Sequence, residues 1–86
     1  MKIRLEKTAN LKIGGLNYKI VYTDLDDCLG KTDFPTSTIY IDKKQNDNQK
    51  FATLVHEILH CLNNQMSEEK VEFLAQGINQ VIRDNF

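Results

Sequence analysis

The order of predicted elements along this 86-residue chain favours an α+β domain, in which a small twisted antiparallel sheet is covered by two helices. The observations behind this prediction are two kinds of periodicity. Residues 11–24 and 36–42 alternate apolar and polar side chains, as strands do, whereas residues 48–63 and 68–84 repeat apolar side chains with a helical period. No internal repeat or linker interrupts these segments, so we expect residues 1–86 to form one domain.

A β-hairpin is predicted at residues 11–24, because the turn dipeptide Gly14-Gly15 separates two alternating runs. The second run places four side chains on one face: Leu16, Tyr18, Ile20 and Tyr22. Residues 1–10 are mixed and charged, as in a short strand or a loose chain end. The Asp-rich segment 24–34 is expected to be a solvated loop, because its carboxylates lack the spacing of a calcium-binding loop. The strand at 36–42, which turns its isoleucines to one face, is expected to form an edge of the sheet.

Two helices follow. The first runs from about residue 48 to 63, and either Asp47 or Asn48 is suited to cap it. Its apolar stripe consists of Phe51, Leu54, Val55, Ile58, Leu59 and Leu62. The second runs from 68 to about 84, after the capping residue Ser67. Its apolar stripe consists of Val71, Leu74, Ala75, Ile78, Val81 and Ile82. The short connection predicts that the two helices form an antiparallel hairpin.

The first helix carries the run His56-Glu57-Ile58-Leu59-His60, which reads H-E-x-x-H. Side chains four residues apart lie on one face of a helix, so His56 and His60 can hold one metal ion. Glu57 lies beside them and is placed to take a proton from a water that the metal activates. Two surface histidines beside a solvated glutamate are the ordinary alternative. The metal site is favoured because the flanks form an amphipathic helix and the chain has no histidine outside the motif.

The motif and its surroundings resemble a known family. Residues 29–33, 38–42, 53–60 and 74–85 are similar to small zincin-like proteins encoded by phages and prophages, which are similar to a minimal core of the ImmA/IrrE-type metallopeptidases. The resemblance covers roughly residues 11–86. It implies a sheet whose edge strand borders the active-site cleft, an active-site helix, and a glutamate from the next helix as the third zinc ligand, which is the gluzincin pattern. Members of the ImmA/IrrE type act on repressor proteins in phage or stress regulation.

The candidates for that third ligand are three glutamates early in the second helix: Glu68, Glu69 and Glu72. At about 100° per residue, Glu68 lies roughly 75° from the centre of the apolar stripe, Glu72 about 115° and Glu69 nearly opposite. A ligand must border the packed face, which disfavours Glu69. Residues near the turn of a helical hairpin face each other, which favours Glu68 over Glu72. A first-turn glutamate stabilised by the helix dipole is the alternative for either, and a ligand from the loop at 24–33 stays open.

Zinc with three protein ligands keeps one position for water, so the motif predicts a zinc-dependent metallopeptidase that hydrolyses peptide bonds with Glu57 as the general base. A substrate peptide, from a regulatory protein if the resemblance holds, would add as an extended segment along an edge strand. The strand at 36–42 is the candidate because it precedes the motif helix. Tyr18 or Tyr40 could stabilise the oxyanion, although half-buried tyrosines in a sheet are more often structural.

Two other classes of protein stay open: a zinc-stabilised, catalytically silent interaction or regulatory module, and a small DNA-associated phage regulator whose histidines are incidental. The net charge of −1 counts against nucleic acid as a partner. No run reaches the ~20 apolar residues of a membrane span, and residues 1–6 lack the apolar core of a signal peptide. We therefore expect a cytoplasmic protein, in a bacterial host cell if the resemblance holds. Cys28 and Cys61 are expected to be reduced and partly buried.

Overall fold

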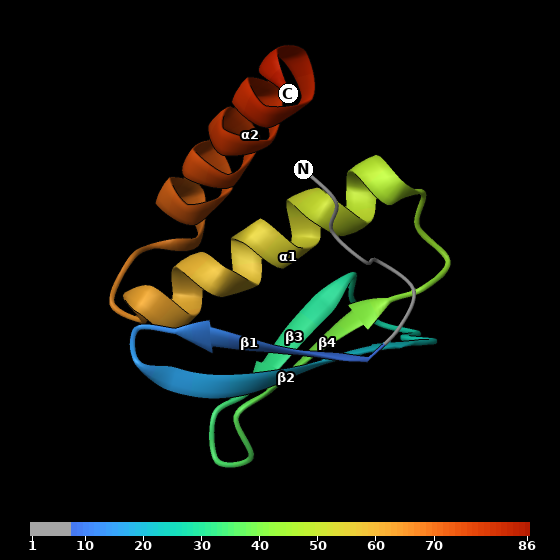
Figure 1. Ribbon diagram of the computed structural model, residues 1–86, viewed down its shortest axis with the longest axis vertical. Coiled ribbons are helices and arrows are strands. Elements are labelled where there is room, and N and C mark those ends of the chain that lie inside the picture. The colour runs from blue at the N-terminus through green and yellow to red at the C-terminus, as the bar shows by residue number, and fades with distance from the viewer. Residues whose placement is uncertain (1–7) are drawn as a thin grey trace.

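The computed structural model describes residues 8–86, which form a four-stranded sheet and two helices in the predicted α+β class (Figure 1). The elements in chain order are β1 (Ala9–Ile13), β2 (Leu16–Thr23), β3 (Gly30–Asp33), β4 (Thr38–Asp42), α1 (Asp47–Leu62) and α2 (Glu68–Asn85). Helix α1 crosses one face of the sheet, and α2 lies on the far side of α1 (Figure 1). Of the described helices, α1 therefore covers the sheet directly, whereas the sequence suggested that both would. Neither helix has the length and apolar character that crossing a membrane requires.

The predicted hairpin is confirmed, with β1 and β2 paired antiparallel. Gly14 and Gly15 have φ angles of 57° and 85°. Residues without a Cβ adopt this left-handed pair at little cost, and its twist matches that of the flanking strands. The first strand begins at Ala9 rather than at residue 11. The rest of the predicted short strand or loose end, residues 1–7, lies outside the described part of the chain.

The sheet is mixed, which corrects the all-antiparallel sheet expected from the sequence. Its strand order is β1-β2-β4-β3, and β2 pairs with β4 in parallel. The segment 24–34, predicted to be a solvated loop, contains β3, which pairs antiparallel with β4. A parallel return of the chain needs a long connection, and this segment supplies the length. The strand predicted at 36–42 is consequently an inner strand, and the edge strands of the sheet are β1 and β3.

The hydrophobic core lies between the sheet and α1. Its buried members are Ile13, Tyr18, Ile20, Ile39, Ile41 and Leu54. The two isoleucines of β4 are fully buried on the same face, as the alternation predicts. From α1, Ile58 and Cys61 pack against this cluster. A second contact joins the helices, where α2 buries Val71 and Ala75 toward α1. The apolar surface of α1 is thus shared between two layers.

Each helix begins at a side-chain cap. The cap of α1 is Asn46, which corrects the expected Asp47 or Asn48. Oδ1 of Asn46 accepts a hydrogen bond from the Gln49 N–H at 2.8 Å, and Oε1 of Gln49 accepts one from the Asn46 N–H at 3.2 Å. This reciprocal pair satisfies the N–H groups of Asn46 and Gln49. A cap at Asp47 or Asn48 would leave these groups without that pair of hydrogen bonds. The cap of α2 is Ser67, as predicted.

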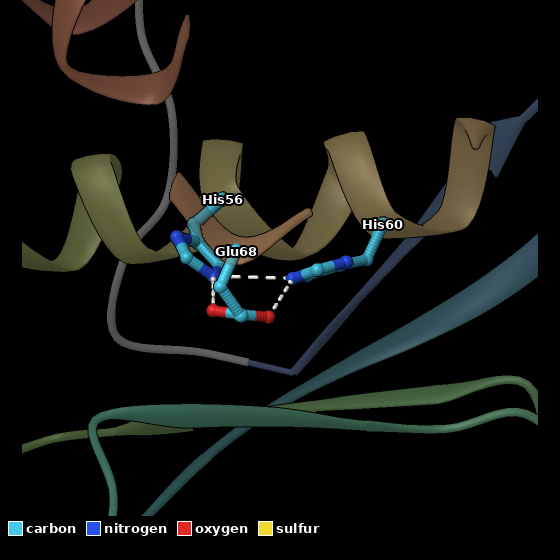
Figure 2. Close-up of side chains that lie close together, drawn as sticks. All are labelled: His56, His60 and Glu68. Carbon is cyan, nitrogen blue, oxygen red and sulfur yellow. Dashed lines mark hydrogen bonds and ion pairs between the residues drawn. The ribbon is translucent and has the colours of Figure 1, made fainter. Parts of the chain in front are cut away.

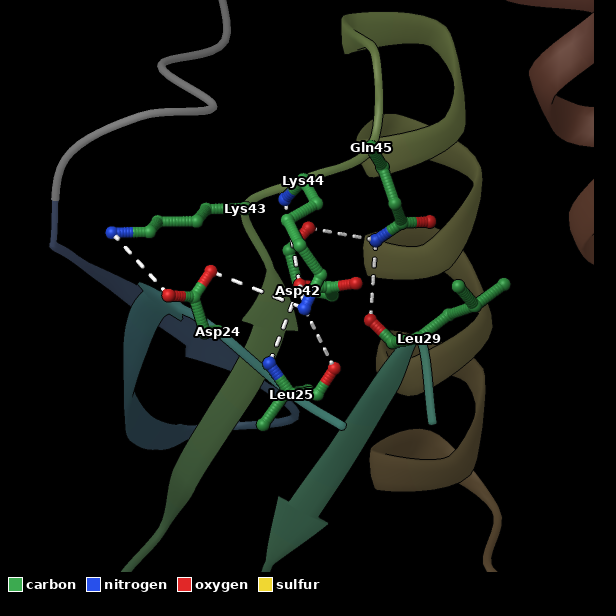
Figure 3. A network of polar contacts seen from close by, with 7 residues as sticks. All are labelled: Asp24, Leu25, Leu29, Asp42, Lys43, Lys44 and Gln45. Atoms are coloured by element: carbon green, nitrogen blue, oxygen red, sulfur yellow. Dashed lines mark hydrogen bonds and ion pairs between the residues drawn. The ribbon is translucent and has the colours of Figure 1, made fainter. Parts of the chain in front are cut away.

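A polar network holds the loop before β3 against the end of β4 (Figure 3). The buried Asp42 carboxylate accepts hydrogen bonds from the N–H groups of Leu25 (3.3 Å) and Lys44 (3.4 Å). Burial raises the pKa of Asp42, but these hydrogen bonds outweigh it and hold the pKa below its ordinary value. The side-chain amide of Gln45 donates to the carbonyls of Leu29 (3.2 Å) and Asp42 (3.0 Å). The edge strand is therefore held in place through Leu29, the residue that precedes it.

Gly30 allows β3 to approach α1 closely. A Cβ at this position would lie 2.5 Å from Cγ2 of Thr53 and 3.3 Å from the carbonyl oxygen of Tyr40. Thr53 is held in its rotamer because its hydroxyl donates a hydrogen bond to Oε1 of Gln45 at 2.8 Å. The absence of a side chain at Gly30 thus sets the distance between the edge strand and the motif helix.

We expect Gly30→Ala to destabilise the fold by about 1–3 kcal/mol, because the added methyl group overpacks the contact between β3 and α1. Thr53→Ser removes the opposing methyl group and keeps the hydroxyl. The double variant Gly30→Ala/Thr53→Ser should recover most of the loss, as measured by urea unfolding in a double-mutant cycle. Additive losses in the double variant would contradict this account of the contact.

Candidate metal centre

The two histidines of the motif converge on one point. His56 and His60 lie one turn apart on α1, and their side chains are mostly buried. Their Nε2 atoms are 3.2 Å apart, and their rings meet edge to face, with centroids separated by 4.9 Å (Figure 2). The helix spacing that predicted a shared site therefore brings one nitrogen of each ring to the same place.

Glu68 brings its carboxylate to the same point from α2. Its Oε2 lies 3.2 Å from Nε2 of His56, and its Oε1 lies 2.6 Å from Nε2 of His60 (Figure 2). Ser67 starts α2 immediately after a short connection, so the first helical residue faces the end of α1. Among residues 8–86, this is the group of His, Cys, Asp or Glu side chains placed to share an ion, with ligand atoms within 4.8 Å of one another.

The spacing and chemistry of this cluster fit one zinc ion. Two ligands held about 2.0–2.1 Å from a tetrahedral zinc lie about 3.3 Å apart. The two histidine Nε2 atoms, at 3.2 Å, match that separation. Two imidazole nitrogens with one carboxylate are also a donor set used by catalytic zinc sites, where a fourth position stays open. The side chains present are therefore suited to Zn²⁺ in both donor type and spacing.

Glu72 contacts the outer nitrogen of His56. Its Oε2 lies 3.0 Å from Nδ1 of that ring, and its Oε1 accepts a hydrogen bond from the Gln76 amide at 2.7 Å. A proton on Nδ1 satisfies this contact and leaves the Nε2 lone pair facing Glu68 and His60. Carboxylates commonly orient metal-binding histidines in this way. Glu72 is thus placed to fix the tautomer and direction of His56 rather than to reach the centre of the cluster.

Glu57 turns toward the edge strand. Only 8% of its surface is exposed, and its Oε1 accepts a hydrogen bond from the hydroxyl of Thr32 at 2.8 Å. Together with His56 it lines a cavity of about 390 Å³ that also borders Leu29, Gly30 and α2. The carboxylate therefore stands between β3 and the histidines, at the wall of a space large enough for part of a small ligand.

The structure separates the candidates for the third ligand. Glu68 contacts both histidines, Glu72 contacts the outer nitrogen of one, and Glu69 is exposed and outside the cluster. No carboxylate of the segment 24–33 belongs to the cluster found among the described residues. The geometry follows the order predicted from the helix periodicity, and the role of Glu68 as a ligand stays a prediction.

Two contacts of the site were not foreseen from the sequence. Thr32, which holds Glu57, lies in a short polar strand where no alternation of apolar residues marks it. The contact of Glu72 with His56 had a usable signal. Glu72 follows Glu68 by one helical turn, so the two carboxylates rise along one face of α2 as the histidines do on α1.

The tyrosines and cysteines near the site have other surroundings. Tyr18 is buried in the core, and its burial and the neighbouring Cys61 raise its pKa. Tyr40 lies on the face of β4 away from α1, with the ammonium of Lys31 5.6 Å from its ring centre. Neither tyrosine is therefore directed at the histidines. Cys28 and Cys61 are half-buried and form no disulfide, as expected. Burial raises the pKa of both thiols.

Comparisons of the chain with protein-family models, with curated proteins and with solved structures find no match. The resemblance to ImmA/IrrE-type metallopeptidases stays a prediction that rests on the residues themselves.

Substitution of the three glutamates of α2 tests their assigned positions. We expect Glu68→Ala to weaken zinc binding by more than ~100-fold and Glu72→Ala by ~10–100-fold, because one removes a ligand and the other the support of a ligand. Glu69→Ala, which removes the same charge from the same turn, should leave the affinity unchanged. Affinities can be measured by competition with a zinc-binding dye. An equal loss in the Glu68 and Glu69 variants would mean that only the charge of the helix end matters.

Proposed function

We propose that this protein is a zinc-dependent metallopeptidase of the H-E-x-x-H type, in which His56, His60 and Glu68 hold the metal. The observation that carries the proposal is the convergence of two Nε2 atoms, 3.2 Å apart, on the two oxygens of one carboxylate. The position of Glu57 next to this cluster, at the wall of a cavity, supports a hydrolytic role in addition to metal binding.

Each side chain of the site then has a chemical task. Zinc at this point would lower the pKa of a water to about 7 and polarise the carbonyl of the scissile bond. Glu57 would take the proton of the attacking water and deliver it to the leaving amine. Thr32 donates to Oε1 of Glu57, which leaves Oε2 of that carboxylate to accept the proton. Glu72 would keep His56 in the tautomer that presents Nε2.

The proposed substrate is a peptide segment in an extended conformation. The edge strand beside Glu57 is β3, which replaces the strand at 36–42 expected from the sequence. One side of β3 pairs with β4, and its other side is an edge at which an extended peptide could add by main-chain hydrogen bonds. On the family resemblance, the proposal extends to a regulatory protein as substrate in the cytoplasm of a bacterial host.

The second candidate function is a zinc-stabilised interaction module that cleaves nothing. The observation that favours it is the burial of Glu57, because a carboxylate that is 8% exposed and held by Thr32 could serve structure alone. The attachment of α2 favours it as well. A metal held by both helices would fasten α2 to α1 in a chain whose core is small.

Both candidates require the metal. We expect purified protein to carry about one zinc per chain and to lose thermal stability when the zinc is chelated, because metal binding is coupled to folding. His56→Ala should melt at the temperature of the chelated protein and should no longer respond to chelator. Elemental analysis and melting curves give both quantities. Sub-stoichiometric zinc after supplementation, with an unchanged melting temperature for His56→Ala, would exclude a metal centre.

Glu57→Gln separates the two candidates. We expect this variant to keep its zinc and to cleave peptides ~10²–10⁴-fold more slowly than the unmodified protein, because the amide preserves shape but cannot transfer the proton. The assay uses a library of quenched fluorescent peptides, with Glu69→Gln as a control for the loss of one glutamate charge. Equal cleavage by Glu57→Gln would contradict the assigned role. Zinc-loaded protein that cleaves neither the library nor an unfolded protein would favour the silent module.

A further inference from the structure

The outward face of α2 is apolar and exposed. Phe73 is 77% exposed, Val81 48% and Ile78 38%. Phe73 and Val81 lie on the side of α2 turned away from Val71 and Ala75, the apolar residues that α2 buries toward α1. Ile78 follows Val71 by seven residues and lies at the border of that buried side. All three belong to one mostly apolar surface, which we call the α2 outer face: Phe73, Leu74, Gly77, Ile78, Gln80, Val81 and Ile82. Contiguous exposed apolar surface of this kind is typical of interaction sites rather than of monomer surfaces.

A hollow runs across the α2 outer face at Gly77. The concave surface there is lined by the apolar residues around this glycine, and nothing lies within 4 Å of the position a Cβ would take. Glycine inside a helix costs about 1 kcal/mol of helix stability relative to alanine. No contact within the described chain explains that cost, because the space above Gly77 is open. A second helix crossing at this point could approach the backbone of α2 closely.

The charges at the ends of this face are arranged for a second copy of the same helix. Lys70, Gly77 and Asp84 are seven residues apart and so lie on one line along α2. The charged pair stands at equal distances from Gly77, about 10 Å on either side. A two-fold axis through Gly77, perpendicular to the helix, would place Lys70 of one copy opposite Asp84 of the other. The same axis would place Phe73 opposite Val81.

Lys70 and Asp84 are both exposed. Hydrogen bonds from Gln80 (3.0 Å) and Arg83 (3.1 Å) hold the pKa of Asp84 below its ordinary value. No ion pair found among residues 8–86 engages the ammonium of Lys70. The face therefore carries Lys70 at one end and, at the other, Asp84 with its ion-pair partner Arg83. These opposite charges suit a symmetric copy of the face, whereas a face that binds an anionic membrane would be rich in basic residues.

We propose that the protein forms a symmetric dimer in which the α2 outer faces of two copies pack antiparallel about Gly77. Such an interface is self-complementary at two pairs of positions, because Phe73 meets Val81 and Lys70 meets Asp84 across the axis. Its centre, Gly77, lies on the side of α2 opposite to Glu68, so the cavity at the metal centre stays accessible. One helix face on each copy is a small interface, and we expect a dissociation constant of about 1–100 µM. The dimer does not depend on metal binding.

Sedimentation velocity over a range of protein concentrations tests the dimer. We expect a concentration-dependent monomer–dimer equilibrium for the full chain, and a monomer at all concentrations for Phe73→Glu and for Val81→Glu. Leu16→Glu is the matched control, because Leu16 is an exposed apolar residue on β2 and its substitution should leave the equilibrium unchanged. Melting curves show that each variant is folded. A full chain that stays monomeric at ~200 µM, above the expected range of dissociation constants, would overturn the proposal.

A charge exchange tests the register. Lys70→Asp and Asp84→Lys should each weaken the dimer by ~10-fold, because each replaces two attractive pairs across the axis with two repulsive ones. The double variant Lys70→Asp/Asp84→Lys restores opposite charges only if the helices are antiparallel about Gly77, and it should return the dissociation constant to within ~3-fold of the original. A dimer insensitive to the single variants, or no recovery in the double variant, would overturn the proposed interface.

Discussion

Helix α1 packs against the sheet on one side and against α2 on another. This constraint limits the positions on α1 that polar side chains can occupy. Leu54 belongs to the core between the sheet and α1, whereas Val55 is buried outside that core cluster. Between the two packed faces α1 has one open side, which carries His56, Glu57 and His60. Because β3 borders this side on one flank and α2 on the other, Glu57 meets Thr32 of β3, whereas both histidines meet Glu68 of α2. The site thus results from the packing of one helix between the sheet and α2.

Periodicity allowed the elements and the donor set to be predicted, because it reports on contacts within one helix or hairpin. The spacing of His56 and His60 and the helix angle of Glu68 are local properties, and the structure brings those three residues together. The strand β3 was missed because its pairing with β4, rather than any apolar pattern of its own, makes it a strand. For the same reason the partner of Glu57, Thr32, could not be found: the hydrogen bond joins residues whose proximity depends on the strand order.

The antiparallel pairing of the helices gives the two histidines and two glutamates distinct environments. Glu68 stands opposite both rings near the turn, and Glu72 stands one turn further along, against His56 alone. The carboxyl groups of Glu68 and Glu72 both contact the ring of His56, and a bound cation would offset repulsion between two such groups. Without a cation, the close approach of two Nε2 atoms requires a proton on one of them. The donor geometry and the charge of the cluster therefore favour the same occupant, a divalent metal.

Helix α2 has few buried contacts of its own. Its buried residues are Val71, Ala75 and Asn79, and Asn79 donates a hydrogen bond to Asn48 near the start of α1 at 3.3 Å. A small chain buries too little surface to hold such an outer layer by its core alone. The proposed metal would act at the first turn of α2, and the proposed second copy on the face turned away from α1. Each would stabilise α2 from a different direction. Together they would hold in place a helix that buries few residues of its own and forms the last layer of the fold.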